Sequence, residues 1–505
     1  MPETKQTQTA QEQPQLEDMS LSASLTENTT LFKKLFQDVD LMQYRSIEGC
    51  GSFCLIWSSG VVNTTALEEH IIRSILKNPI PPITEMPLDH LSRHVLEVSS
   101  MKLESDLSEL VKALCYGDCL LLAEGDNRGL LMEVKAFTSR SVSEPDGEKI
   151  LSGPREGFSE VLMENLSMLR RKLRTSDLKL KYYHIGRRSN TQLCIAYLGT
   201  LVKPSVLTEL YRRLDHIDMD AVLDSHYLTE LIRDQRMSLF RSTGYTERPD
   251  AVAAKLLEGR VAVFVDGTPV VLTLPYLFIE NFQSSEDYYV NFYAATIARF
   301  LRIFGFLLTI IIPGLYVAIL CYHQEMLPSS LLIRIAVDSR NVPFPTPLEV
   351  FALLVMFDIL RETGIRMPNG VGQAMSIVGA LVIGSAAVEA ELVSSNVIIV
   401  TAVSGITTLL VPKLATAVPI LRNVLILISA AMGFYGLMLG VSFLFIHFLN
   451  LESFDVPQVD WNSPLNYQAS KDTFIRGPLW LMRERPNRLS ANKKRMNTSG
   501  KDGST

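Results

Sequence analysis

Four charged side chains interrupt an apolar stretch of the sequence, and their types and spacing suit them to act on ions. They are Glu349, Asp358, Arg361 and Glu362, within the segment Pro343–Arg366. Charged residues inside membrane sequence usually face the interior of a helix bundle or water, and they often mark ion pathways. Rings of acidic side chains select cations in channels. We therefore interpret these four residues as candidates for a pore or a gate.

Three of these candidates also have structural interpretations that need no function. Thr346, Pro347 and Glu349 match a capping box, in which the glutamate only helps to start a helix. Asp358 and Arg361 have the i,i+3 spacing of an ion pair within one helix. The sequence leaves both interpretations open.

The length of the charged helix bears on how it meets a membrane. Gly364 and Pro368 predict that the helix ends near Glu362. The helix Pro347–Glu362 then spans about 24 Å, against a hydrocarbon core of about 30 Å. This favours a short re-entrant or interfacial helix, although a full crossing stays open.

The elements that position this helix are apolar runs, which lie between residues 303 and 448 of the 505-residue chain. About 20 apolar residues suffice for a helix to cross a bilayer. We predict about four spans in a transmembrane domain of residues 299–449, in addition to the short charged helix. The predicted spans are Ile303–Tyr322, Val371–Val388, Leu392–Val411 and Val424–Ile446.

The portion before residue 299 contains an internal repeat. Gln192–Ile217 is similar to Ser52–Leu76, and Gly259 follows Gly117 at nearly the same separation. Each copy combines helix signals with a closing strand–turn–strand pattern. The predicted fold class is thus α/β plus membrane α, with two related α/β subdomains before the helical membrane domain. The predicted ranges are 31–140 and 180–298 for the subdomains and 141–179 for a helical connection.

The two ends of the sequence differ from the rest. Residues 1–30 are rich in Gln, Thr, Ser and Glu, which predicts a disordered leader. Arg299 and Arg302 precede the first predicted span, so the positive-inside rule places the soluble portion in the cytoplasm. From Lys471 to Thr505 there are nine Lys and Arg against three Asp and Glu. This basic tail, within residues 450–505, favours contact with membrane lipid rather than nucleic acid, since no nucleic-acid recognition motif accompanies it.

Patterns that would indicate an enzyme are missing from the sequence. It has no P-loop, no dinucleotide-binding glycine pattern, no nucleophile elbow and no kinase signature. Cys50 and Cys54, like Cys115 and Cys119, are three residues apart, but no histidine accompanies them. We interpret these cysteines as small buried residues and predict no metal and no cofactor.

Several motifs give the chain a resemblance to a known family. They are GPREGF at 153–158, TERPD at 246–250, EDYY at 286–289, VPFP at 342–345, RETG at 361–364, GQAMSIVGALVIGSAAV at 372–388 and IRGPLWLMRERP at 475–486. In this order they resemble the GerA spore germination protein family. Ser152 and Ser385 depart from the family pattern, which weakens any role for those two positions.

The resemblance implies the A subunit of a nutrient germinant receptor in the spore inner membrane, with its N-terminal domain in the spore core. It also implies a transporter-like B subunit and a lipoprotein C subunit as partners. Homo-oligomers of the A subunit would form a gated cation channel that triggers germination.

Two other functions remain open from the sequence. The two subdomains could close around a small molecule and signal to a separate channel. The chain could also be an accessory spore-membrane protein of the same family.

Overall fold

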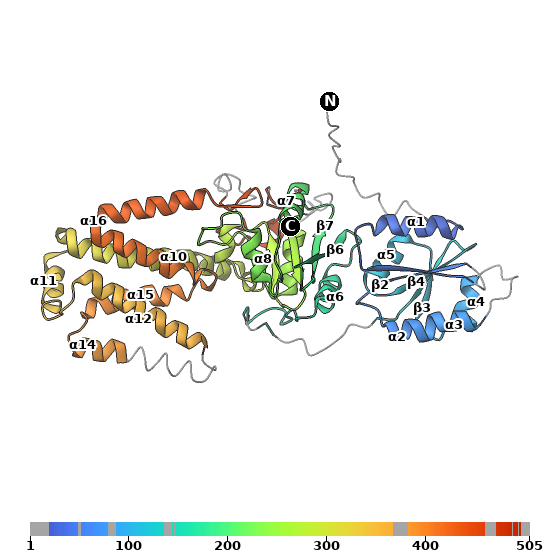
Figure 1. Ribbon diagram of the computed structural model, residues 1–505, viewed down its shortest axis with the longest axis horizontal. Coiled ribbons are helices and arrows are strands. Elements are labelled where there is room, and N and C mark those ends of the chain that lie inside the picture. Colours follow the sequence, from blue (N-terminus) through green and yellow to red (C-terminus); the bar gives the residue numbers. More distant parts are fainter. Residues whose placement is uncertain are drawn as a thin grey trace, which may run out of the picture.

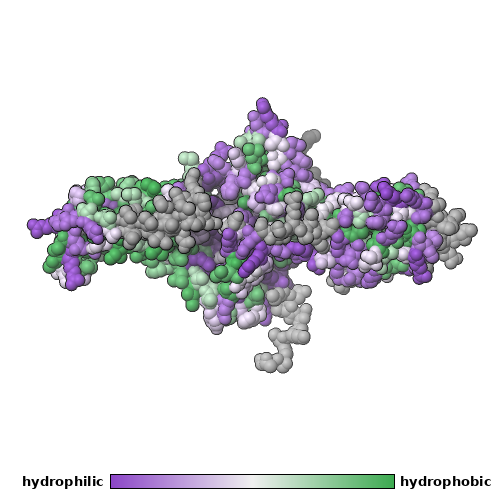
Figure 2. Space-filling model, turned by 90° about the horizontal axis from the view of Figure 1, so that it is seen from below, coloured by the Kyte–Doolittle hydropathy of each residue, from purple (hydrophilic) through white to green (hydrophobic). Residues whose placement is uncertain are grey.

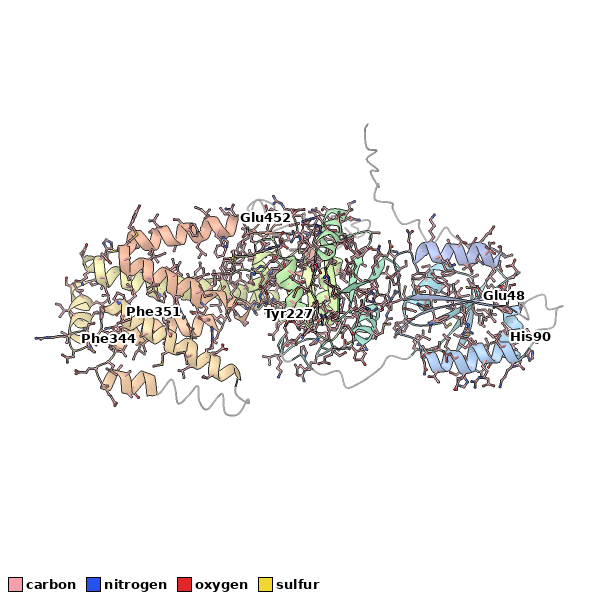
Figure 3. All side chains as sticks on the ribbon, viewed as in Figure 1. Glu48, His90, Tyr227, Phe344, Phe351 and Glu452 are labelled. Atoms are coloured by element: carbon pink, nitrogen blue, oxygen red, sulfur yellow. The ribbon has the colours of Figure 1, made fainter. Side chains whose placement is uncertain are left out.

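The computed structural model describes residues 20–48, 52–78, 87–135, 144–145, 147–366, 382–459, 471–486, 488–492 and 494–495. The molecule is elongated, with α/β structure at one end and helices at the other (Figure 1). Glu48 and His90 mark the α/β end and Phe344 and Phe351 the helical end (Figure 3). Hydrophobic side chains gather on the surface of the helical part (Figure 2).

The first subdomain is a five-stranded antiparallel sheet with helices on both faces, in the strand order β1-β2-β4-β5-β3. Successive residues of a strand point to opposite faces, and here both faces are buried. In β2, Cys54 and Ile56 pack beneath α1 and α5, while Phe53 and Leu55 face η2 and α4. The elements are α1 (Leu25–Leu35), β1 (Met42–Ile47), β2 (Phe53–Ser58), α2 (Thr64–Ala66), η2 (Leu67–Ile72), α3 (Arg73–Lys77), α4 (Pro87–His94), β3 (Met101–Glu104), α5 (Leu107–Cys115), β4 (Cys119–Ala123) and β5 (Gly129–Met132).

The second subdomain repeats this topology, with the strand order β6-β7-β9-β10-β8. Cys194 in β7 takes the place of Cys54 in β2, and both side chains are buried. The internal repeat predicted from the sequence is therefore confirmed. The elements are α6 (Leu162–Lys172), β6 (Leu178–Ile185), β7 (Thr191–Leu198), α7 (Pro204–Asp215), α8 (Ser225–Ile232), β8 (Gly244–Thr246), α9 (Pro249–Leu257), β9 (Val261–Val265), β10 (Val271–Leu274), η3 (Phe278–Phe282) and η4 (Ser285–Tyr288).

The two subdomains share one hydrophobic core. A single cluster of buried side chains runs from Phe32 and Cys54 in the first to Leu180 and Cys194 in the second. The backbone also links them, because the amide of Asp40 donates to the carbonyl oxygen of Leu180 at 3.0 Å. The junction is therefore filled by packed side chains, which argues against closure of the subdomains around a ligand.

The predicted disordered leader is wrong for its last residues. Helix α1 begins at Leu25, because Phe32 is fully buried and Phe36 nearly so in the shared core. Residues 1–19 of that prediction lie outside the described residues. The sheet-edge strands β1, β3, β6 and β8 were not predicted, although β3 and the start of β6 alternate between apolar and polar residues.

The helical part begins with α10 (Phe292–Tyr322). By length and composition, α10 and α16 are the two described helices that could cross a membrane, but α16 is bent in its middle. Helix α15 covers most of the third predicted span, whereas residues 371–381 of the second lie outside the described residues. The remaining elements are η5 (Gln324–Met326), α11 (Ser329–Asp338), α12 (Thr346–Arg366), η6 (Val382–Ala386), α14 (Ala387–Glu389), α15 (Ser395–Thr408), η7 (Pro412–Leu414) and α16 (Ala417–Leu449).

Helix α16 is folded into a hairpin at Gly433. This residue has φ +62° and ψ −143°, a conformation that glycine adopts and other residues avoid. The two arms run from this bend back toward the α/β part and diverge on the way (Figure 1), and near the bend a Cβ atom at Gly440 would lie 2.5 Å from Cδ2 of Leu425. In a straight helix these two positions would be about 22 Å apart. Both ends of α16 therefore lie at the end of the helical part that faces the soluble subdomains.

The described residues of the tail pack on protein. They form the short pair β11 (Glu452–Ser453) and β12 (Val456–Pro457), and Phe454 is fully buried in the core of the second subdomain. Further on, the carbonyl oxygen of Arg488 accepts a hydrogen bond from Nζ of Lys203. These contacts attach the described tail to the second subdomain, while Ile475, Leu479 and Trp480 are exposed. Contact of the basic tail with lipid stays a prediction.

Candidate functional site

The central feature of the helical part is an ion pair between α12 and α16. Oδ2 of Asp358 lies 2.7 Å from Nη2 of Arg422, whose side chain is fully buried. Nη1 of the same arginine lies 3.3 Å from Oγ of Ser404 in α15. One guanidinium therefore joins three helices, and burial in an apolar bundle makes such a pair strong while both partners stay in place.

This arrangement contradicts the ion pair expected between Asp358 and Arg361. Nη2 of Arg361 instead donates to the carbonyl oxygen of Ala415 at 3.2 Å. Arg422 is the more deeply buried cation, and an unpaired buried charge costs several kcal/mol, about 3–5 when a partner is lost. Asp358 therefore pairs with Arg422, which the sequence did not single out.

The expected short helix is also wrong. Helix α12 runs from Thr346 to Arg366, so its 21 residues span about 31 Å. Gly364, the predicted stop, lies inside the last turn. A glycine weakens a helix by only about 1 kcal/mol, which is insufficient to end one that packs against its neighbours. The length of α12 thus no longer favours a re-entrant helix over a full crossing.

Glu349 lies at the other end of α12 and caps a neighbouring helix. Its Oε1 accepts a hydrogen bond from the backbone amide of Ser394, the residue that precedes α15. The glutamate is 4% exposed, and α12 already begins at Thr346. The expected capping box within α12 is therefore replaced by a carboxylate at the positive N-terminal end of α15.

The four candidates do not form one cluster. Glu349 is nine residues before Asp358, or about 13 Å along the helix axis. Glu362 is exposed at the end of α12, whereas Asp358 and Arg361 are partly buried. In the structure Asp358 thus belongs to a buried ion pair, Glu349 caps a helix and Glu362 is an exposed acid.

Small polar side chains line the interior beside the ion pair. Oγ1 of Thr309 and Oγ1 of Thr407 are 2.6 Å apart, and Oγ of Ser404 donates to the carbonyl oxygen of Thr309 at 3.1 Å. The sequence analysis missed these residues. Their signal was Ser and Thr spaced within apolar runs, which hydrogen-bond between membrane helices.

A second group of charges joins the helical part to the soluble part. Nε of Arg299 lies 3.1 Å from Asp287, and Nη1 of Arg302 lies 2.9 Å from the same carboxylate. Both arginines begin α10, and Arg299 and Asp287 are almost wholly buried. Residues that the sequence assigned only to membrane orientation therefore also anchor α10 to η4.

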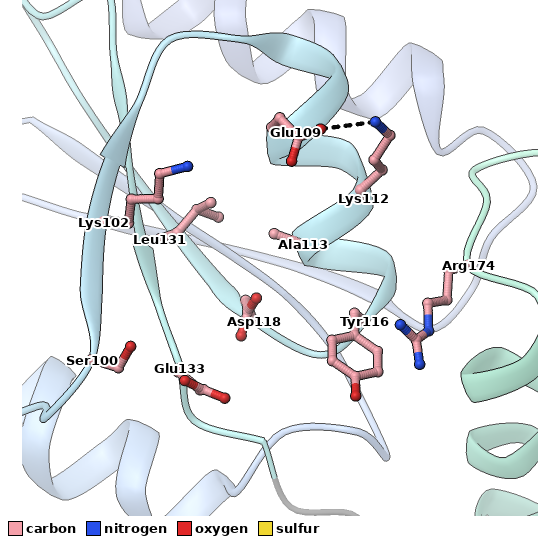
Figure 4. A pocket seen from close by; sticks show the side chains of 10 residues that line it. All are labelled: Ser100, Lys102, Glu109, Lys112, Ala113, Tyr116, Asp118, Leu131, Glu133 and Arg174. Atoms are coloured by element: carbon pink, nitrogen blue, oxygen red, sulfur yellow. Dashed lines mark hydrogen bonds and ion pairs between the residues drawn. The ribbon is translucent and has the colours of Figure 1, made fainter.

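The first subdomain has a polar groove of about 540 Å³ next to α6 (Figure 4). The guanidinium carbon of Arg174 lies 3.7 Å from the ring centroid of Tyr116, and Nζ of Lys135 lies 4.4 Å from it. Lys112 pairs with Glu109 at 2.8 Å. The lining thus presents side chains of both charges, namely Lys102, Lys112 and Arg174 beside Glu109, Asp118 and Glu133.

The cysteine interpretation is confirmed where it can be followed. Cys54, Cys115 and Cys119 are buried, with burial raising the pKa of each thiol. Cys50 lies outside the described residues. Thiols of raised pKa are poor nucleophiles and poor metal ligands at neutral pH.

A paired α/β part joined to two long apolar helices fits the class of proteins that combine a folded α/β domain with membrane association. The chain belongs to the GerA family, since residues 30–488 match the family described as Bacillus/Clostridium GerA spore germination protein. The resemblance stated from the motifs is thereby confirmed.

Related proteins match along most of their length. Spore germination protein KA of Bacillus subtilis (strain 168) is 39% identical over 438 residues, covering 86% of this chain and 80% of the relative. "Uncharacterized membrane protein YfkQ" of the same organism is 36% identical over 479 residues, covering 94% of this chain and 93% of the relative. Among solved structures, the chain matches the crystal structure of the N-terminal domain of the A subunit of the Bacillus megaterium spore germinant receptor GerK3. The sequences are 31% identical, the match covers 52% of this chain and 98% of the solved chain, and the TM-score is 0.41.

Proposed function

We propose that this chain is the A subunit of a spore germinant receptor and that its helical part forms an oligomeric, gated cation channel. The observation that carries the proposal is the buried pair of Asp358 and Arg422. It ties α12 to α16 and sits among polar side chains inside an apolar bundle. Charges in such a place are expensive and mark sites where ions or helices move.

In this proposal the ion pair holds the closed state. Arg422 neutralises Asp358, so the aspartate cannot attract cations while the pair is formed. Opening would separate α12 from α16 and expose the carboxylate. Glu362, which is exposed at the end of α12, is then assigned to a pore mouth, and Glu349 is assigned to helix capping.

The proposed location and partners follow from the family. The names of the relatives associate them with spore germination, and one solved domain is named as a receptor A subunit. We assign this chain to the spore inner membrane with its soluble part in the spore core, beside a transporter-like B subunit and a lipoprotein C subunit. No enzymatic activity is assigned.

The test measures cation release from spores after nutrient addition. Spores would carry Asp358→Asn, Arg422→Gln or Glu362→Gln at normal subunit levels. Breaking the pair is expected to cause release without nutrient, whereas Glu362→Gln is expected to slow nutrient-triggered release. Arg340→Gln, an exposed cation after α11, serves as the control. Normal release in all three variants would overturn the channel assignment.

A second candidate function is nutrient binding by the soluble part, which the polar groove of Figure 4 favours. Calorimetry of the purified chain with amino acids would test it, with Tyr116→Ala as the variant that removes the stacked ring. Heat that is unchanged by Tyr116→Ala, or no heat at all, would contradict binding in this groove.

A further inference from the structure

A cavity of about 610 Å³ lies where the soluble part, the membrane helices and the tail meet. Its apolar wall comes from η3, from the middle of α10 and from the last turns of α16. The volume is within the range of small-molecule sites, about 300–1,000 Å³. The apolar lining includes Phe278, Phe282, Phe306, Leu307, Phe448 and Leu449.

The aromatic wall of this cavity is continuous. The ring centroids of Phe278 and Phe448 are 4.6 Å apart, and those of Phe282 and Phe306 are 5.4 Å apart. Ile303, which also lines the cavity, is the first residue of the uncharged stretch of α10. The wall therefore lies where the helices enter the hydrocarbon region, next to the lipid headgroups.

The carboxylates around the cavity already have cationic partners. Glu280 lies between Arg260 and Lys255, whose Nζ is 3.1 Å from it. Burial raises the pKa of Glu280, but the charges of Arg260 and Lys255 outweigh it and lower the pKa to about 2. Glu280 therefore stays ionised, and together with Glu258 it balances the charge of Arg260 and Lys255.

The other acidic groups are balanced in the same way. Glu258 lies 3.3 Å from Arg260, and Asp472 lies 3.1 Å from Arg299. Asp250 likewise pairs with an arginine, at 2.9 Å. The acidic residues of the lining thus leave little negative charge for any further cation.

Lys413 and Arg495 line the cavity without an ion pair to any carboxylate of the described residues, and Lys413 lies on the side of the aromatic wall. Nζ of Lys413 donates to the carbonyl oxygens of Glu280 and Gln283, each at 3.1 Å. An ammonium has three N–H donors, so one is left for an anion.

We propose that this cavity binds one anionic phospholipid from the leaflet on the side of the soluble part. Its phosphate would accept the third hydrogen bond of Lys413, and an acyl chain would lie against Phe278, Phe306 and Phe448. Such a lipid contacts the second subdomain, α10, α16 and the tail together. It is a structural ligand of the junction, independent of whether the helices conduct ions.

The test uses native mass spectrometry of the full chain in detergent with phosphatidylglycerol or phosphatidylcholine of equal chain length. One phosphatidylglycerol is expected to stay bound, with weaker retention of phosphatidylcholine. Lys413→Met is expected to weaken the binding of phosphatidylglycerol about fivefold. This factor corresponds to about 1 kcal/mol, the contribution of one cation near an anionic headgroup. Arg340→Met removes an equal charge far from the cavity and should change nothing.

A second pair of variants tests the acyl-chain site. Leu307→Trp fills the cavity and should abolish retention of the lipid, whereas Leu301→Trp alters a comparably exposed leucine of α10 that does not line it. Equal retention of both lipids, or equal loss in both tryptophan variants, would overturn the proposal. Binding of oleate as tightly as phosphatidylglycerol, or displacement of the lipid by inorganic phosphate at equal concentration, would overturn it as well.

Discussion

The carboxylate of Asp472 in the tail lies 3.1 Å from Nη1 of Arg299 at the start of α10. The hydroxyl of Tyr288 donates to the same carboxylate at 2.9 Å. Residues 173 positions apart in the sequence are thus tied together at the point where the chain enters the helical part. The tail is therefore part of the junction between the soluble and helical parts.

This pair predicts a pH dependence of tail docking. Burial raises the pKa of Asp472 from 3.8 to about 6, although Arg299 acts to lower it. A carboxyl whose pKa is raised on docking binds protons more readily in the docked state, so docking becomes more favourable as pH falls from about 6 towards 4. Amides near residue 472 should exchange roughly tenfold more slowly at pH 5 than at pH 7, after correction for intrinsic rates.

The matched control for this prediction is Asp472→Asn, which keeps the shape and cannot titrate. Its corrected exchange rates should be the same at both pH values. A tail that loosens at pH 5 in the wild type but not in this variant would contradict the sign of the prediction.

The pair of Asp358 and Arg422 predicts strongly non-additive effects on stability. Arg422→Met alone leaves a carboxylate unpaired and should lower the free energy of unfolding by about 3–5 kcal/mol. The double variant with Asp358→Leu should recover most of the loss, because no charge is then left in the bundle. Denaturation in a mild detergent measures the coupling, and additive effects would show that the two residues do not interact.

Glu349 predicts a local effect on α15. Glu349→Ala removes the acceptor of the Ser394 amide and should cost about 1 kcal/mol, as loss of a helix cap does. Hydrogen exchange should then quicken in the first turn of α15 and not in its last turn. Glu389→Ala, an exposed acid before α15, is the control. Equal exchange in the two variants would refute the capping role.

The hairpin at Gly433 predicts a cross-link within α16. Cysteines at positions 425 and 440 should be joined by a short bifunctional reagent, since those positions are in contact. A background of Cys321→Ser removes the exposed native thiol of α10. A straight helix would separate the two sites by about 22 Å and give no product.

Sequence reasoning was most successful where the signal was local or repeated. The paired glycines and cysteines of the two copies predicted the matching sheets, because each copy must bury the same faces. It failed for Asp358, because its partner Arg422 is 64 residues away and only packing of α12 on α16 brings them together. The hairpin at Gly433 was also missed. Gly436 and Gly440 in the same helix could adopt a positive φ equally well, and the sequence does not show which of the three glycines does so.

Because of the hairpin in α16, the helical part is attached to the second subdomain at both of its ends. The polypeptide leaves the second subdomain through α10 and returns to it through the second arm of α16, and Gly314 of α10 packs against Leu437 of that arm. A tilt of the soluble part would therefore move α10 and the second arm of α16 together. Helices α12 and α15 lie between α10 and α16 in the chain and also contact them through side chains. Such a movement would therefore reach α15 through Thr309 and Thr407, and it would reach α12 through the pair of Asp358 and Arg422 in the first arm of α16.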